Sequence, residues 1–297
     1  MDAIHRFLLE DLDIRGALVQ LGPAWEAMHR WRNYAAPVRN LLGELAAVAA
    51  VIGGNLKSSG RLTLQLQGHG PVSLLLMDCD DQLRMRGMAR SELADEATIR
   101  ESNAAALAQP ELTTIRHLLG DGRLVLSLYN DTAGEPYQSL VPLVGDSLAA
   151  LFEHYLLQSE QQPARLWLAA TEETACGLFL QKLPDADMRD SDGWRRIEQL
   201  ADTVRPDELT LAPEVLLTRL FGTEKVRLFA SRPIALNCPR NEEKVRDMLL
   251  TLGREELENL LEDAEIIAIE DEICGHKYLF GPEIIDELFP PEGRILH

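Results

Sequence analysis

The sequence predicts an α+β fold made of a mixed core, a helical linker and a small C-terminal module. Helix-like and strand-like patterns alternate over residues 1–183, which indicates a core of mixed sheets and helices. The pattern changes at Pro184, and residues 184–236 contain two amphipathic helices separated by Pro and polar residues. An acidic segment with short helices and a β-rich run occupies residues 237–297. We therefore expect three parts, with boundaries near residues 183 and 236.

The core elements follow from hydrophobic periodicity. Residues Ala36 to Lys57 are rich in Ala and Leu and are apolar on most faces, which predicts a buried helix. Residues Arg61 to Gly68 alternate with period two and begin a series of strands broken by Gly and Asp turns. Residues Gly145 to Gln161 place apolar side chains at helical spacing after an Asp-Ser cap signal. Further strands are predicted in PVSLLLM, QLRMRGMA, GDGRLVLSLYND, ARLWLAAT and ACGLFLQKLP.

The linker and the module are predicted to be mainly helical. The linker helices are expected in DADMRDSDGWRRIEQLADTV and APEVLLTRLFG. Their amphipathic pattern predicts a linker that packs and is not a flexible tether. In the module, NEEKVRDMLLTLGREELENLLED predicts two short helices around Gly253. The run EIIAIE that follows predicts a strand.

Composition excludes several classes of protein. The net charge of −19 argues against nucleic-acid binding, since phosphate recognition relies on clustered Lys and Arg. The longest uncharged apolar stretch, Leu45 to Leu56, is shorter than the roughly 20 residues of a transmembrane helix. The N-terminal residues show no signal peptide, and four scattered cysteines do not make a disulfide scaffold. We expect a cytoplasmic protein that does not bind a membrane.

The sequence does not predict an enzyme. It contains no HExxH metal motif and no Gly-x-Ser-x-Gly nucleophile elbow. The stretch GGNLKSSG lacks the Gly-Lys-Ser/Thr pattern of a phosphate loop and follows a helix rather than a strand. Cys79 and Cys176 lie in strand-like apolar surroundings, where cysteine usually behaves as a small buried hydrophobic residue.

The C-terminal stretch EIIAIEDEICGHKYLF resembles the second half of a zinc ribbon. A zinc knuckle at this place would offer Cys-x-x-Cys followed by a short strand. Cys274 is present, but Asp271 takes the place of the first cysteine. The pattern therefore predicts a metal-type scaffold that lacks part of its ligand set.

Several longer phrases resemble one family, the redox-regulated 33-kDa heat-shock proteins, which are ATP-independent holdase chaperones. These phrases are DIRGALVQL, LLGELAAVAAVIGGNLKSSGRLTLQLQGHGPVSLLLMDC, GDGRLVLSLYND, PYQSLVPLVGDSLAALFEHYLLQSEQQP, GLFLQKLP and LGREELENLLEDAEIIAIEDEICGHKYLF. The resemblance is collinear over nearly the whole chain. It implies an N-terminal substrate-binding core over residues 1–183, a helical linker over 184–236 and a C-terminal α/β redox-switch domain of the zinc-binding type over 237–297.

In the resembled family, a Cys-x-Cys pair and a later Cys-x-x-Cys pair together bind one zinc ion. Cys238 matches the first position, and Arg240 stands at the second. Asp271 stands at the third position, and Cys274 matches the fourth. Two of the four cysteines are therefore replaced, which predicts a degenerate site and an altered switch.

Two arrangements of this degenerate site are compatible with the sequence. Cys238, Cys274 and Asp271 could hold zinc with His276 or water as the fourth ligand, although Arg240 would bring a permanent positive charge beside the dication. We favour the alternative, a structural ion pair between Arg240 and Asp271 in place of the ligands. No cofactor is then required, and zinc is expected at low occupancy.

The resemblance also implies how such a protein works. Family members bind unfolding client proteins under oxidative or heat stress, and activation is linked to a monomer–dimer equilibrium. Oxidation forms two disulfides between neighbouring cysteines, which cannot happen here. A single Cys238–Cys274 disulfide would instead restrict the unfolded chain by ~3–4 kcal/mol and stabilise the domain. The alternative hypothesis is a non-chaperone interaction scaffold that kept the fold and lost the switch.

Overall fold

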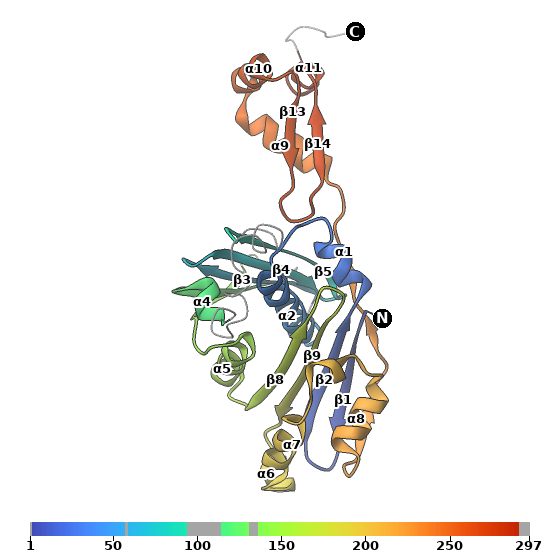
Figure 1. Ribbon diagram of the computed structural model, residues 1–297. Coiled ribbons are helices and arrows are strands. Elements are labelled where there is room, and N and C mark those ends of the chain that lie inside the picture. The colour runs from blue at the N-terminus through green and yellow to red at the C-terminus, as the bar shows by residue number, and fades with distance from the viewer. Residues whose placement is uncertain (1, 57–58, 94–113, 131–135, 291–297) are drawn as a thin grey trace. The chain divides into compact units, whose positions relative to one another are not determined.

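The computed structural model describes residues 2–56, 59–93, 114–130 and 136–290. The chain forms two compact units, Met1–Asn237 and Cys238–His297, called here the core unit and the C-terminal unit (Figure 1). The core unit contains two sheets and most of the helices, and the C-terminal unit contains a hairpin and three short helices. The predicted α+β class is confirmed.

The first sheet, sheet A, is antiparallel and has the order β10-β1-β2-β9-β8, with β11 also paired to β1. Gly16 lies opposite Phe7, whose ring occupies the space that a Cβ at position 16 would need. The strands are β1 (Ala3–Leu9), β2 (Ile14–Leu21), β8 (Ala164–Ala170), β9 (Ala175–Lys182), β10 (Val226–Leu228) and β11 (Arg232–Pro233).

The second sheet, sheet B, has the order β12-β5-β4-β3-β6-β7. Its inner face is apolar, because the alternate residues of β3, β4 and β6 that point inward are Leu, Met or Cys. The strands are β3 (Gly60–Gly68), β4 (Val72–Asp80), β5 (Arg84–Ser91), β6 (Gly122–Asn130), β7 (Tyr137–Pro142) and β12 (Ala235–Leu236).

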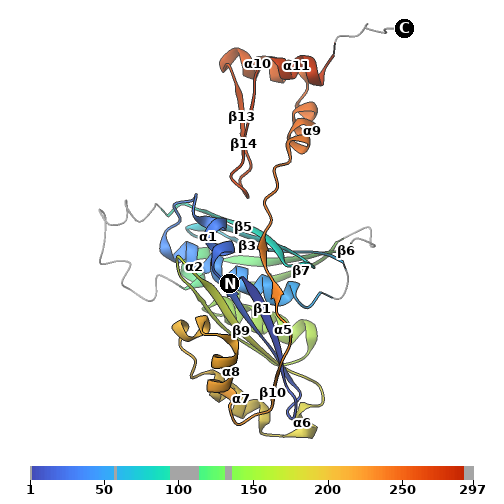
Figure 2. The ribbon, with the colours of Figure 1, turned by 90° about the vertical axis from the view of Figure 1, so that its right-hand side faces the viewer.

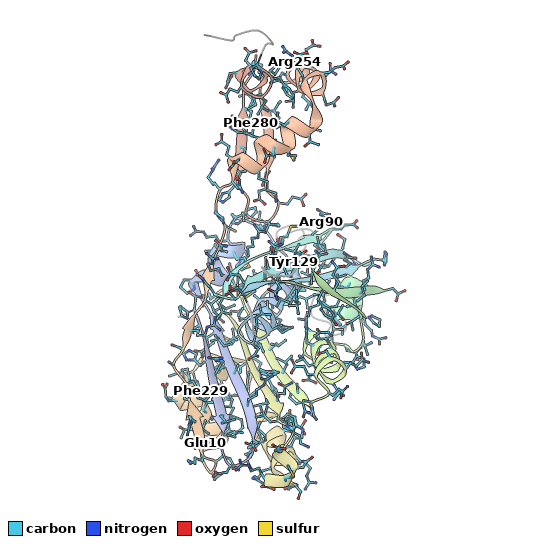
Figure 3. All side chains as sticks on the ribbon, turned by 180° about the vertical axis from the view of Figure 1, so that it is seen from behind. Glu10, Arg90, Tyr129, Phe229, Arg254 and Phe280 are labelled. Carbon is cyan, nitrogen blue, oxygen red and sulfur yellow. The ribbon has the colours of Figure 1, made fainter. Side chains whose placement is uncertain are left out.

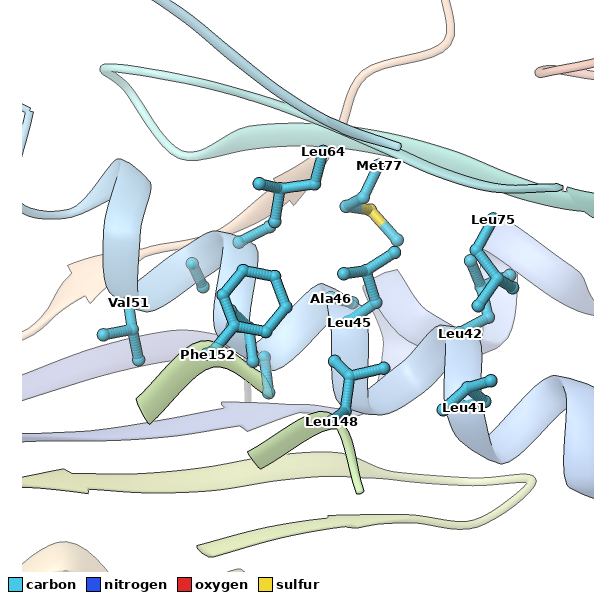
Figure 4. Close-up of a cluster of buried hydrophobic side chains, with 14 of the residues drawn as sticks. Leu41, Leu42, Leu45, Ala46, Val51, Leu64, Leu75, Met77, Leu148 and Phe152 are labelled. Atoms are coloured by element: carbon cyan, nitrogen blue, oxygen red, sulfur yellow. The ribbon is translucent and has the colours of Figure 1, made fainter. Parts of the chain in front are cut away.

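Helix α2 (Ala36–Gly53) lies between the two sheets and is the centre of the main core. Figure 4 shows Leu45 of α2 beside Met77 of sheet B, with Leu148 and Phe152 on another side. The helix is long and apolar enough to cross a membrane, but 67% of it is buried inside the protein. Packing between two sheets therefore explains its composition.

The helix was predicted to continue to Lys57, which lies outside the described residues; α2 ends at Gly53. A Cβ at position 53 would lie 2.6 Å from the Cys79 sulfur, so the helix end packs tightly on β4. The other helices around this core are α1 (Pro23–His29), α4 (Ile115–Leu119) and α5 (Leu148–Glu160), with the Ser147 hydroxyl capping α5.

The segment after β9 covers the other face of sheet A (Figure 2). Its helices are α6 (Ala186–Arg189), α7 (Gly193–Ala201), the 3₁₀ helix η2 (Pro206–Thr210) and α8 (Pro213–Phe221). The expectation of helices alone was incomplete, because β10, β11 and β12 also lie in this segment and pair with β1 and β5. Strands of two or three residues are too short to show period-two alternation.

The C-terminal unit has its own small core. Helices α9 (Glu242–Leu252) and α10 (Arg254–Asp263) meet at Gly253, whose φ of 88° suits glycine. They pack with the hairpin β13 (Ile267–Glu270) and β14 (Lys277–Phe280) and with α11 (Glu283–Leu288). The buried residues of this core are Leu249, Leu257, Ile267, Tyr278, Phe280 and Ile284.

We predict that Glu44 makes the stability of the core unit depend on pH. Burial on α2 raises the pKa of this carboxyl from 4.5 to about 7. The folded state therefore binds the proton more tightly than the unfolded state, and stability falls as the pH rises from about 4.5 to about 7. Glu44→Gln is expected to raise the free energy of unfolding at pH 8 by about 1–3 kcal/mol and to change it little at pH 4.5.

Urea denaturation at the two pH values measures this effect. Glu173→Gln, at an exposed turn residue, serves as the control and should show no such difference between the two pH values. A Glu44→Gln chain no more stable than wild type at pH 8 would contradict the prediction.

Candidate functional site

The turn between β13 and β14 is held together by Asp271. Its Oδ1 atom accepts hydrogen bonds from the Ile273 amide at 2.9 Å and from the Cys274 amide at 3.2 Å. The Asp271 carbonyl accepts a third bond from the Gly275 amide at 2.7 Å, and Gly275 has a φ of 69°. An Asp side chain that binds amides two and three residues ahead is a common way to close a tight turn. Asp271 therefore acts as the cap of this turn.

The segment that begins with Cys238 lies against the same hairpin. The His276 Nε2 atom donates to the Cys238 carbonyl at 2.7 Å, and the Asn241 amide donates to the Tyr278 hydroxyl at 2.9 Å. Arg240 donates to the Lys277 carbonyl at 2.8 Å. The structure therefore brings the backbones of both cysteine-bearing segments to one end of the hairpin.

The favoured ion pair between Arg240 and Asp271 is not formed between these two described residues. The Arg240 guanidinium instead lies over the Tyr278 ring, with its central carbon 4.9 Å from the ring centroid. The Asp271 carboxylate is engaged by local amides of its own turn. Each charged group therefore has other partners. Asp271 binds amides of its own turn, and Arg240 contacts Lys277 and Tyr278 of β14.

The residues present do not fit a structural zinc site. Among the described residues, no group of three or more His, Cys, Asp and Glu side chains is placed so that it could hold a metal ion. The Asp271 Oδ1 atom already accepts two amide bonds, and the His276 Nε2 atom donates to the Cys238 carbonyl, so only the Nδ1 atom of His276 could face a metal. A tetrahedral structural site needs four ligands, and Cys238 and Cys274 supply only two.

All four cysteines lie in the described part of the chain, and none is in a disulfide bond. Cys79 and Cys176 are buried, as their apolar neighbours predict. Burial raises the pKa of the Cys79 thiol to about 12 and that of Cys176 to about 11, so neither forms a reactive thiolate near neutral pH. Cys274 is 8% exposed and Cys238 is partly exposed. Cys79 and Cys176 are therefore structural residues of the core.

A second candidate feature is the apolar face of sheet A beneath the linker helices. Strand residues such as Leu9, Leu18 and Leu178 are fully buried against Ile197 and Phe221 of the linker. Burying one such side chain contributes about 1.5–3 kcal/mol, so the cluster binds the linker firmly. The sequence indicated that the linker packs on the core, but it did not show which sheet face it covers.

Sequence reasoning missed Tyr278 as part of the C-terminal site. Its hydroxyl binds the backbone at Asn241, and its ring carries the Arg240 guanidinium. The one available signal was its position on a short strand after the knuckle, where an inward aromatic residue is expected to be core.

Fold and site together define a class: two-unit α+β proteins with a helix-covered sheet and a C-terminal unit built on a hairpin. The model of the family described as "Hsp33 protein" matches residues 2–281. The 33 kDa chaperonin of Methylobacillus flagellatus is 35% identical over 294 residues, covering 98% of this chain and 95% of that protein. The 33 kDa chaperonin of Vibrio cholerae is 35% identical over 304 residues, covering 99% and 98%. The chain belongs to the Hsp33 protein family.

A solved structure shows the same fold. The crystal structure of the 33 kDa chaperonin from Thermotoga maritima matches with a TM-score of 0.78, covering 97% of this chain and 98% of that one. The two sequences are 21% identical, so this likeness speaks for the fold alone. The resemblance noted from the sequence is therefore confirmed for both family and fold.

We predict that the turn depends on the Asp271 carboxylate. Asp271→Ala removes the acceptor of two amide bonds and is expected to destabilise the C-terminal unit by about 1–3 kcal/mol. Asp271→Asn keeps one oxygen acceptor and should lose much less. Hydrogen-exchange protection of the Ile273 and Cys274 amides in the full chain measures the effect.

The exposed Glu265, just before β13, provides a control, since Glu265→Ala removes an acidic side chain from the same unit. If Asp271→Ala exchanges no faster than Glu265→Ala at both amides, the capping role assigned to Asp271 is wrong.

Proposed function

We propose that this protein is an ATP-independent holdase that binds unfolding proteins in the cytoplasm and keeps them from aggregating. One observation carries the proposal: a chain of a chaperone family keeps a large apolar sheet face under a helical segment of its own. Large apolar surfaces on soluble proteins mark interaction sites when they are exposed. Release of the linker would expose such a surface without any nucleotide.

The linker is held by burial more than by charge. Arg165 of β8 pairs with Glu198 of α7 at 3.5 Å and with Asp202, just after α7, at 3.4 Å, and these side chains are partly exposed. Such pairs contribute about 0–1 kcal/mol each, less than one buried Leu or Phe. Heat weakens this cover directly, because the conformational entropy of an unfolded linker gains weight as temperature rises. We therefore propose that heat, or an oxidant that unfolds the linker, exposes the client surface.

The acidic charge suits this activity. A net charge of −19 keeps a complex with an unfolded client soluble through mutual repulsion. The proposed partners are unfolded or partly folded proteins, with homodimer formation on activation. The comparisons with chaperonins do not support the alternative of a scaffold for one folded partner.

The altered cysteine site changes the expected regulation. The turn that a metal would organise is capped by Asp271, and the Cys238 segment is fixed by His276 and Tyr278. We propose that the unit folds without a required cofactor and holds zinc at low occupancy at most. A single disulfide between Cys238 and Cys274 would lower the conformational entropy of the unfolded chain and so stabilise the unit. Peroxide would then fail to release the linker.

We predict holdase activity that does not depend on a thiol switch. Light scattering of a thermally aggregating client, without ATP, should fall in the presence of about equimolar protein. Peroxide should change this activity less than twofold, and Cys238→Ser/Cys274→Ser should behave as wild type. Protection should increase with preheating, together with faster proteolysis of residues 184–236.

Two results would contradict these proposals in different ways. No suppression of aggregation under reducing, oxidising or heated conditions would remove the holdase. Strong activation of the wild type by peroxide, abolished in Cys238→Ser/Cys274→Ser, would show that the thiol switch survives.

We also predict that two substitutions restore the metal site. Wild-type protein purified under reducing conditions should contain well below one zinc per chain by elemental analysis. Arg240→Cys/Asp271→Cys supplies four thiols and is expected to bind about one zinc per chain. Arg240→Ala/Asp271→Ala is the control and should bind no more than wild type. Stoichiometric zinc in wild type that resists mild chelation would refute the degenerate site.

A further inference from the structure

The core unit contains an apolar cavity of about 490 Å³. The described residues that line it belong to the core elements and not to the linker helices. It lies where α2, β6, β7, α5 and β9 come together, and three tyrosines line it: Tyr129, Tyr137 and Tyr155. Cavities that bind ligands are typically about 300–1,000 Å³ and are mostly apolar with a few polar groups. Its size and lining therefore fit a binding site.

A second cavity of about 310 Å³ continues the first one. The two share Arg15, Asn55 and Phe179 as lining residues, so they meet at the end of α2. The second cavity reaches Phe229, which follows β10 beside β1. We call the combined space the tyrosine groove. Figure 3 shows Tyr129 on sheet B and Phe229 at the edge of sheet A.

Both ends of the tyrosine groove carry exposed aromatic rings. Tyr137 is 62% exposed at one end, and Phe229 is 43% exposed at the other. A groove whose rims remain apolar and open suits a chain that passes through it, whereas a small molecule would be enclosed. Tyr137 also belongs to β7, the edge strand of sheet B, and edge strands offer unpaired main-chain groups to an added strand.

Polar groups near the middle of the groove are held in place. Arg15 donates to the Gln181 side chain at 2.7 Å and pairs with Glu160 at 3.3 Å, while Gln181 donates to Glu160 at 2.8 Å. Arg6, which lines the second cavity, adds another guanidinium. Guanidinium groups donate several hydrogen bonds and accept none, so they suit the carbonyl groups of a peptide main chain.

We propose that the tyrosine groove binds an extended segment of an unfolded client, with aromatic or long aliphatic side chains in the cavity. This inference rests on the proposed holdase function and names a client surface outside the linker-covered face. The surface is open in the folded, linker-packed structure, so binding there needs no oxidation. It would supply first contact with a client before heat releases the linker.

The experiment measures the affinity for reduced, carboxymethylated α-lactalbumin, a permanently unfolded protein, by fluorescence polarisation at a temperature where the linker is packed. Tyr137→Ala/Phe229→Ala is expected to raise the Kd about tenfold, equal to about 1.4 kcal/mol. Asn55→Trp, which fills the junction of the cavities, should weaken binding to a similar extent. Asn55 is exposed, and unfolding midpoints check that each variant folds.

The matched control is Leu140→Ala/Met188→Ala. Leu140 lies on β7 three residues after Tyr137 but does not line the groove, and it is 60% exposed, while Met188 is 80% exposed. This variant removes exposed apolar surface elsewhere and should bind as wild type. Equal loss in the control and the groove variants would show non-specific apolar binding and overturn the inference.

The remaining outcomes separate this inference from the proposed function. Wild-type binding that is unchanged in both groove variants leaves the holdase intact and removes the tyrosine groove as a client site. Absence of any client binding by wild type, heated or not, would overturn both. If sedimentation shows that the groove variants lose a dimer while client affinity is unchanged, the groove is a contact between two copies, and the client assignment is wrong.

Discussion

Sheet A is apolar on both faces, and most of the core unit is arranged to keep it from water. Strand β9 is buried at seven of its eight positions, because α2 covers one face and the linker helices cover the other. Hydrophobic burial scales with the apolar area removed from water, so both layers are needed for stability. The linker helices pack in a cluster of buried residues separate from the main cluster around α2. Under the proposed holdase function, this face of the sheet would become a binding surface when the linker leaves.

The C-terminal unit has a small hydrophobic core and needs other contacts for its stability. A metal-type hairpin normally gains its stability from coordination, since a core of six buried side chains is small. Here hydrogen bonds hold the same elements: Asp271 closes the turn, and the Tyr278 hydroxyl and the Lys277 carbonyl fix the incoming segment. Such bonds do not break on oxidation, whereas zinc–thiolate bonds do. Under the proposed regulation, oxidation would therefore leave the stability of this unit intact.

The tyrosine groove and the covered face of sheet A would divide client binding into two stages. The groove is accessible in the folded protein, while the sheet face becomes accessible only when the linker leaves. A small permanent surface gives recognition without exposing enough apolar area to cause self-association. The larger face of sheet A, covered until the linker leaves, would bind more client under stress. The two surfaces belong to one unit, so their relative positions are fixed by the same core.

The sequence by itself determined the fold class, the long buried helix and most of the longer strands. These are local properties, readable because side-chain periodicity and motif spacing depend on neighbours along the chain. Tertiary structure alone decided the rest. Arg240 and Asp271 looked like partners, yet Asp271 binds amides two and three residues away and Arg240 reaches β14. Strands β10 to β12 exist because β1 and β5 pair with them, and the tyrosine groove is built from segments more than 200 residues apart, between Arg6 and Phe229.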